Sequence, residues 1–413
     1  MLKLKTLDRY ILLVMFLLLP IDMLNGILLK TGIILPISIG QFFKIIVLFF
    51  VFVRLAVKPN KLIFIFVSFI LLLLPTFYQL LNGNEGVSLL FDVIKISKYI
   101  TPLVCFMFFV DVIKNDHKKN TNLIFKLVNF SYLILIGNIF LKYVGLGYPM
   151  YEFGEIGSKG FFYAGNEISA LLIILSSIIA YRLWMDNSKF KYFLFLLLNI
   201  FVGVTVSSKT GIFGIIIVFL LLPIRGSFLK INIKKLLIIV SSVFVIIPSI
   251  IIYYWDYILK STVFIRLNYF WNKFDILTFL LSNRNNFFND AFDIYKENYN
   301  LFEKTIGVGQ SRYEYLNDNI TVEIDIIDIF FSLGLIGLIL FLLFNIYLFI
   351  QSIKFKRTQI NVYSSFVFLM VFILFIISTT AGHVYSSGMS AVFIGLLFSL
   401  MFIKNQDNKE KLK

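Results

Sequence analysis

Apolar runs of about twenty residues recur along almost the whole chain and are separated mainly by short polar loops. A helix of about 20 apolar residues is long enough to cross the hydrocarbon core of a bilayer. The pattern therefore predicts an all-α polytopic membrane protein, a single transmembrane domain over 1–413, with about twelve spans. They are expected near 10–29, 38–56, 62–81, 96–113, 123–143, 166–182, 191–206, 210–224, 236–255, 326–350, 363–383 and 388–404.

One long polar stretch interrupts this pattern at 256–325, between the ninth and tenth predicted spans. Within it, the apolar residues that recur at helical spacing are Phe287, Phe288, Ala291, Phe292 and Tyr295. The other face carries Asp290, Asp293, Lys296 and Glu297. Such a pattern is typical of interfacial helices that lie on a membrane surface with their apolar side down. A loop this long, in a chain of otherwise short connections, indicates a role in chemistry or recognition.

Composition supports the membrane prediction, because 59% of the residues are hydrophobic and 15% are charged. A formal net charge of +15 would suggest nucleic-acid binding in a soluble protein. However, 24 of the 38 basic residues, but only 6 of the 23 acidic ones, fall on the side of the predicted membrane that holds both termini. That asymmetry orients the protein with both termini in the cytoplasm and leaves no nucleic-acid signal.

Metal and disulfide chemistry find no support in the sequence. Cys105 is the only cysteine and lies inside a predicted span, and the two histidines, His117 and His383, are far apart. No His/Cys spacing suited to a metal exists, so we expect neither a metal nor another cofactor, with a carboxylate-bound divalent ion as the alternative.

Charged residues inside or beside predicted spans are candidates for function. Asp22 and Lys44 lie at similar depth in the first two spans, and we expect them to pair, with contact to an anionic ligand as the alternative. Lys98 is the deepest charged residue of its segment; it fits a solvated helix end or contact with a lipid phosphate. His383 at the outer end of the eleventh span fits a packing residue or a ligand contact.

Asn166 and Glu167 open the sixth predicted span, after an outer segment rich in glycine and aromatic residues. Aromatic rings stack on sugars and carboxylates accept hydrogen bonds from sugar hydroxyls, so this segment suits sugar binding. An ordinary interfacial belt and polar residues in a first helical turn are the alternative.

The remaining candidate functional residues are cations and carboxylates on the outer side of the predicted membrane. Lys209 lies in a tight turn beside hydroxyls and a helix N-terminus, which suits an anion, although snorkelling to the surface is the alternative. Arg284 falls in the first turn of a predicted loop helix, where a cation is unfavourable unless an anion is bound. Glu323 and Asp325 precede the tenth span and, being two residues apart, point in different directions. A solvated loop edge is the alternative for these two carboxylates.

Together these features resemble the O-antigen polymerase and ligase superfamily. The motif-level matches are GNE at 165–167, SSKTG at 207–211, SNR at 282–284, IGVG at 306–309 and SLGLIGLILF at 332–341. The architectural resemblance covers the whole chain, and the order and spacing of the motifs support it.

The resemblance implies a GT-C-like, metal-independent glycosyltransferase at the outer face of the bacterial cytoplasmic membrane. Wzy-type polymerases of this superfamily move a growing O-antigen, capsule or exopolysaccharide chain from undecaprenyl diphosphate to the next lipid-linked repeat unit. A chain-length regulator is a further partner to expect, beside membrane lipid. The resemblance and position together give the diphosphate-binding candidates Lys209, Arg266, Arg284 and Arg312, and the sugar or lipid-head candidates Asn166, Glu167, Gln310, Tyr315, His383 and Lys98. Lysine replaces the arginine usual in the turn, so Lys209 lacks a bidentate fork.

The ligase branch of the superfamily uses a histidine just ahead of the tenth span, where this chain has Glu323 and Asp325. That departure favours a polymerase, with Glu323 as the first candidate for the general base and Asp325 as the second. A ligase-type transferase, a flippase or transporter of the same lipid-linked units, and a non-enzymatic assembly partner are the alternatives. A transporter would be expected to show balanced loops and internal repeats, whereas this chain has one outsized loop.

Overall fold

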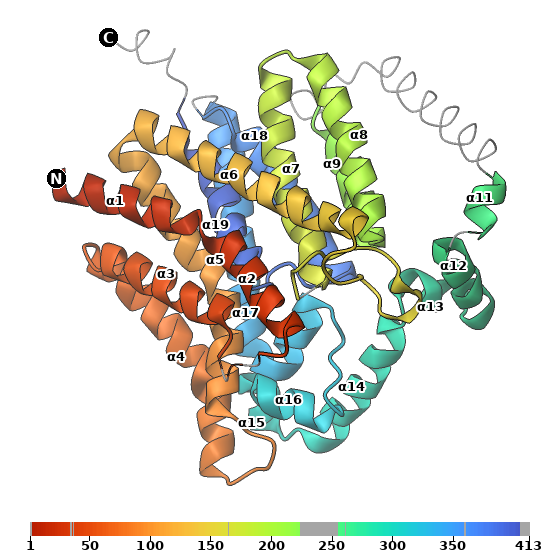
Figure 1. Cartoon of the computed structure of the whole chain (residues 1–413). Coiled ribbons are helices and arrows are strands. Elements are labelled where there is room, and N and C mark those ends of the chain that lie inside the picture. The colour runs from red at the N-terminus through yellow and green to blue at the C-terminus, as the bar shows by residue number, and fades with distance from the viewer. Residues whose placement is uncertain are drawn as a thin grey trace.

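A computed structural model of the chain confirms the all-α fold (Figure 1). It describes residues 2–404 except 34, 36, 164, 224–254, 261 and 359–360. The helices before the gap are α1 (Leu2–Met15), α2 (Leu18–Lys30), α3 (Ile39–Leu55), α4 (Pro59–Leu81), α5 (Leu89–Asn115), α6 (His117–Phe140), α7 (Gly165–Met185), α8 (Lys189–Val206) and α9 (Lys209–Leu221). The apolar helices after the 255–324 loop are α17 (Asp325–Thr358), α18 (Ser364–Thr380) and α19 (Ala391–Ser399).

Seven helical stretches of the described chain are long and apolar enough to cross a membrane, and α9, α18 and the α19 stretch are shorter apolar helices. The first predicted span is divided between α1 and α2. Pro20 has no N–H to donate to the carbonyl of Phe16, so the helix breaks between Met15 and Leu18. The ninth predicted span, 236–255, lies almost wholly outside the described residues, and the count of about twelve stays a prediction.

The long loop is helical, as expected. It forms α11 (Trp255–Lys260), α12 (Thr262–Lys273), α13 (Ile276–Leu281), α14 (Arg284–Asn298), α15 (Leu301–Ile306) and α16 (Gln310–Leu316). We call the end of the helical bundle that carries this loop the loop face, and the opposite end, which carries Arg54, Lys58 and Lys61, the basic face.

Three polar contacts dock α15 and α16 onto the loop-face ends of α4 and α5. Gln79 Nε2 donates to Glu303 Oε1 at 2.7 Å, and the backbone N–H of Ser311 donates to Asp92 Oδ1 at 2.6 Å. Lys95 pairs with Glu314 at 2.9 Å. These contacts cover the loop-face end of the α4 and α5 pair.

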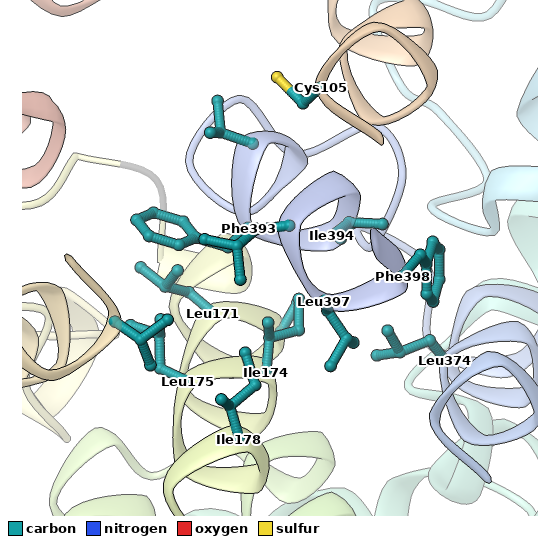
Figure 2. Packing of buried hydrophobic residues seen from close by; sticks show 14 of the residues in the cluster. Cys105, Leu171, Ile174, Leu175, Ile178, Leu374, Phe393, Ile394, Leu397 and Phe398 are labelled. Atoms are coloured by element: carbon teal, nitrogen blue, oxygen red, sulfur yellow. The ribbon is translucent and has the colours of Figure 1, made fainter. Parts of the chain in front are cut away.

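A buried apolar cluster joins α7, α18 and α19 (Figure 2). It includes Leu171, Ile174, Leu175, Ile178, Leu374, Phe393, Ile394, Leu397 and Phe398. Gly395 allows α19 to approach α5 closely, because a Cβ there would lie 2.6 Å from the Cβ of Cys105. The segment between α18 and α19, which carries His383, is therefore held at both ends by packed helices.

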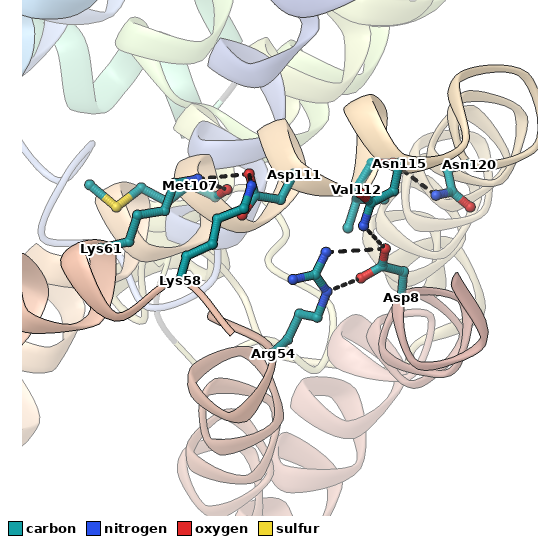
Figure 3. A network of polar contacts seen from close by, with 9 residues as sticks. All are labelled: Asp8, Arg54, Lys58, Lys61, Met107, Asp111, Val112, Asn115 and Asn120. Atoms are coloured by element: carbon teal, nitrogen blue, oxygen red, sulfur yellow. Dashed lines mark hydrogen bonds and ion pairs between the residues drawn. The ribbon is translucent and has the colours of Figure 1, made fainter. Parts of the chain in front are cut away.

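Several buried charges in the bundle are paired. The expected pair of Asp22 and Lys44 is present, with Lys44 Nζ 2.8 Å from the carboxylate. On the basic face, Arg54 Nε donates to Asp8 Oδ1 at 2.5 Å, and both residues are at most 1% exposed (Figure 3). Asn115 Nδ2 donates to the other oxygen of Asp8 at 2.9 Å. Charge is expensive in a membrane interior, so such pairs connect helices that could not bury either partner alone.

The Asp8–Arg54 pair gives a stability prediction. Arg54→Gln leaves the Asp8 carboxylate buried without its cation and should lower the free energy of unfolding by about 3 kcal/mol. Adding Asp8→Asn should recover most of that loss. Reversible unfolding of the full chain in detergent measures both, with Lys118→Gln on the exposed basic face as the control. Equal loss in the single and double variants would contradict the assignment.

Candidate functional site

Three segments far apart in the chain meet at the loop face. They contribute Arg284 at the start of α14, Glu323 just ahead of α17, and His383 between α18 and α19. Arg284 Nη2 lies 3.1 Å from Glu323 Oε2, and His383 Nε2 lies 3.6 Å from Glu323 Oε1. We call these three residues the site cluster. The side chains are 13%, 36% and 28% exposed, respectively, so the cluster is shielded but reachable.

The backbone around the site cluster is strained. Among the described residues, nine other than glycine have positive φ angles, and five of these lie in or beside the site. Such conformations cost free energy and gather at functional sites. The five are Ser207, Ser282, Asn283, Glu323 and His383. Asn283 stands at the N-cap position of α14 but its side chain does not cap the helix.

Asp325 holds the His383 segment in place. Its carboxylate accepts hydrogen bonds from the backbone N–H groups of His383, Val384 and Tyr385 at 3.0–3.1 Å. It also accepts from the hydroxyls of Ser378 at 3.0 Å and Ser386 at 2.7 Å. Five donors satisfy both oxygens of a residue that is 2% exposed. The geometry therefore gives Asp325 an anchoring role and leaves Glu323 as the better placed of the two candidate bases.

The turn at 207–210, which we call the serine turn, lies beside the site cluster. Ser208 caps α9 by accepting from the N–H of Gly211 at 3.2 Å, and Ser169 on α7 donates to Ser208 Oγ at 2.7 Å. Lys209 Nζ donates to the carbonyl of Phe279 at 3.1 Å and lies 4.2 Å from the centre of its ring. Lys209 thereby connects the serine turn to α13.

A small cavity joins the serine turn to the site cluster. It has a volume of about 30 Å³, and its lining includes Ser169, Ser208, Thr210, Arg284 and His383. A space of that size holds about one water molecule. A phosphate group therefore needs Arg284 or the α13–α14 corner to move outward.

Two donors at the site cluster point to an anionic ligand. Arg284 Nε is buried and has no hydrogen-bond partner among the described residues, and the buried His383 Nε2 faces Glu323 Oε1 at 3.6 Å, beyond ordinary hydrogen-bond distance. Buried polar atoms are rarely left unsatisfied, and in a strained, cation-rich site such donors suit phosphate oxygens.

Charge sets the protonation states of Glu323 and His383. Burial alone would raise the pKa of the Glu323 carboxyl, but nearby His383 and Arg284 outweigh it and hold that pKa below its ordinary value. Burial alone would lower the pKa of His383, but Glu323 and then Asp325 outweigh it and raise that pKa. Glu323 is therefore ionised at neutral pH, and His383 gains a proton more readily than a free histidine.

Lys98 and Glu167 lie in a second polar cluster, around Gly388. Glu167 Oε2 accepts hydrogen bonds at 2.8 Å from the hydroxyl of Ser387 and from the N–H of Met389. A Cβ at Gly388 would lie 3.4 Å from Lys98 Cε and 3.9 Å from both Glu167 Oε2 and Lys44 Nζ. This cluster shares the α18–α19 segment with His383.

The structure places the other candidates elsewhere. Arg312 Nη1 donates to the carbonyl of Glu85 at 2.9 Å, and the Tyr315 hydroxyl donates to the carboxylate of Glu85 at 3.1 Å. Gln310 Nε2 donates to Glu314 at 2.9 Å. Arg312 and Tyr315 therefore serve the docking of α16, and Gln310 makes a contact within that helix. The side chains of Asn166 and Arg266 lie outside the described part of the chain.

Sequence reasoning missed two features of the site. Nothing in the sequence signalled that His383 would meet Glu323, because they are sixty positions apart and on different elements. The anchoring role of Asp325 could have been suspected from SSGMS at 386–390, since a serine-rich segment after a span supplies donors for a buried carboxylate.

This arrangement defines a helical membrane protein with a cationic, partly shielded site at one face. A family model described as O-antigen ligase like membrane protein matches residues 6–260 and 268–407. The chain therefore belongs to this family of membrane glycosyltransferase-like enzymes, which take part in lipid-linked polysaccharide assembly. No curated protein matches the chain. Among the described residues, no group of three or more His, Cys, Asp or Glu is arranged to hold a metal ion.

The contact between Glu323 and His383 gives a pH prediction. The raised pKa of His383 means stability that is present below about pH 6.5 and lost as pH rises through the folded value; the lowered pKa of Glu323 means stability present above about pH 4.5 and lost as pH falls. His383→Gln should therefore lower the melting temperature most between about pH 4.5 and 6.5 and least above pH 8. Thermal unfolding in detergent across this range checks it, and a pH-independent difference would contradict it.

Proposed function

We propose that the chain is a polymerase of lipid-linked oligosaccharide repeat units, acting at the loop face. The observation that supports this most is the convergence of Arg284, Glu323 and His383 beside the serine turn. The donor would be a glycan on undecaprenyl diphosphate, and the acceptor the next lipid-linked unit of an O-antigen, capsule or exopolysaccharide. In this proposal the protein is a multi-pass protein of the bacterial cytoplasmic membrane, with both termini cytoplasmic and the loop face outside.

Binding of the diphosphate starts with Arg284. Its guanidinium, with Lys209 at the serine turn, neutralises the charge of the leaving group, and the N–H groups at the start of α9 add to this. Arg284 pairs with Glu323 in the resting site, so a bound phosphate competes for the same cation. Loss of that pairing raises the pKa of Glu323 and converts it from a counter-ion to a base.

The transfer itself breaks one bond and forms one. The acceptor hydroxyl oxygen bonds to the anomeric carbon of the donor glycan while the bond from that carbon to the diphosphate breaks. Glu323 accepts the hydroxyl proton. The undecaprenyl diphosphate leaves with the electron pair of the broken bond, and the cations stabilise its negative charge. His383 positions the carboxylate, and Asp325 positions His383 through the backbone.

A ligase-type transfer is the second candidate function, and one observation favours it. The absence of a histidine ahead of α17 argued for a polymerase, but His383 reaches the same carboxylate from the α18–α19 segment. The sequence argument against a ligase is weaker for this reason. The two functions differ in the acceptor, since a ligase transfers the glycan to something other than another lipid-linked repeat unit.

Substitution of Arg284 tests diphosphate binding. Arg284→Lys keeps the charge but loses the planar fork, and it should weaken binding of undecaprenyl diphosphate by about tenfold. Titration of the purified chain measures this, and Arg9→Lys at the basic face, which makes the same chemical change, should bind as the wild type does. Wild-type affinity in Arg284→Lys would contradict the assignment.

Substitution of Glu323 tests the base. Glu323→Gln should bind undecaprenyl diphosphate at least as tightly as the wild type, because Arg284 loses its internal partner, yet lower the transfer rate by about a hundredfold or more. In a strain lacking the gene, this variant should leave single repeat units on the carrier. Glu297→Gln, an exposed carboxylate of the same loop, is the control. Normal polymer from Glu323→Gln would show that another group takes the proton.

A further inference from the structure

An apolar groove between α4, α5 and α17 plays no part in the proposed chemistry. Its volume is about 630 Å³. Along α5 its lining runs from Tyr99 to Lys114, which corresponds to about 22 Å of helix. That is most of the hydrocarbon thickness of a bilayer, so the groove can hold a whole extended acyl chain.

The groove is separate from the cavity at the site cluster. The two have no lining residue in common. The contacts of Glu303, Ser311 and Glu314 hold α15 and α16 over the loop-face ends of α4 and α5, so these two helices cap the pair that lines the groove. A lipid headgroup in this groove therefore belongs at the basic face.

Charge at the basic-face end identifies the headgroup. Lys61 and Lys114 are the charged residues among those that line the groove. Lys61 Nζ donates to Asp111 Oδ1 at 2.8 Å, and Lys58 Nζ donates to the same oxygen at 2.7 Å (Figure 3). Lys114 lies 4.8 Å from the ring centre of Phe402 and makes no hydrogen bond to the described residues. Lys58 and Lys61 thus share one carboxylate, Lys114 has no carboxylate partner among the described residues, and the excess positive charge suits an anion.

We propose that this groove binds an anionic phospholipid, with its phosphate between Lys61 and Lys114 and an acyl chain along α17. An acyl chain fits the apolar wall formed by Phe64, Leu72, Leu103, Leu340 and Phe344. The negative phosphate would neutralise the positive charge of the lysines that Asp111 does not neutralise. The site needs neither the diphosphate donor nor the transferase reaction.

Lipid binding to the purified full chain tests the proposal. Phosphatidylglycerol and phosphatidylcholine with the same acyl chains are titrated into the chain in detergent, and bound lipid is counted by native mass spectrometry. Wild type should bind phosphatidylglycerol about tenfold more tightly than phosphatidylcholine. Lys61→Gln with Lys114→Gln should lose this preference, because glutamine retains a donor for Asp111 but carries no charge. Leu340→Trp should weaken binding of both lipids by filling the groove.

The matched control is Lys118→Gln with Lys119→Gln, which removes two exposed lysines of the basic face outside the groove. This variant should keep the preference. If the Lys61 variant fails to fold, Lys114→Gln alone should still reduce the preference about threefold. Equal binding of the two lipids by wild type, or equal loss in both lysine pairs, would overturn the proposal. A third result would also overturn it: undecaprenyl phosphate displaces phosphatidylglycerol from the wild type and binds the Lys61 and Lys114 variant as tightly as the wild type. The groove would then hold a prenyl chain.

Discussion

The ion pair between Arg284 and Glu323 is the interaction on which the candidate site depends. It connects the first turn of α14 to the chain that enters α17, and His383 completes it from a third segment. A cation in the first turn of a helix opposes the helix dipole, so Arg284 needs an anion near it. In the resting protein Glu323 is that anion, and in the proposed reaction the diphosphate takes its place. The exchange of Glu323 for the diphosphate as the anion beside Arg284 thus links substrate binding to activation of the base.

The rest of the bundle follows the same constraint on a larger scale. A buried charge in a membrane protein needs a partner of opposite charge or a full set of hydrogen bonds, and the described helices pair Asp8 with Arg54 and Asp22 with Lys44. Asp325 meets its requirement differently, by accepting five hydrogen bonds from the α18–α19 segment and the end of α18. These hydrogen bonds determine where His383 lies. Packing of α7, α18 and α19 around the apolar cluster then keeps the segment from moving as a whole.

The sequence allowed the fold class and several local features to be predicted, because these depend on short-range patterns. Apolar run lengths predicted the helices, aromatic spacing predicted α14, and similar depth predicted the pairing of Asp22 with Lys44. The break between α1 and α2 was missed because the length of the apolar run favoured one continuous helix in spite of Pro20. Convergence of Glu323 with His383, and the diversion of Arg312 and Tyr315 to Glu85, depend on how distant helices pack. No local pattern encodes that packing. The candidate residues could therefore be named from the sequence, but which of them meet in one site could not.

The most direct test of the central claim is an experimental structure of the full chain with a short polyprenyl diphosphate bound in lipid nanodiscs. Our account predicts phosphate oxygens within hydrogen-bond distance of Arg284, with the guanidinium withdrawn from Glu323 and the carboxylate facing the anomeric side of the ligand. A diphosphate bound elsewhere, with the contact between Arg284 and Glu323 still at about 3.1 Å, would contradict it.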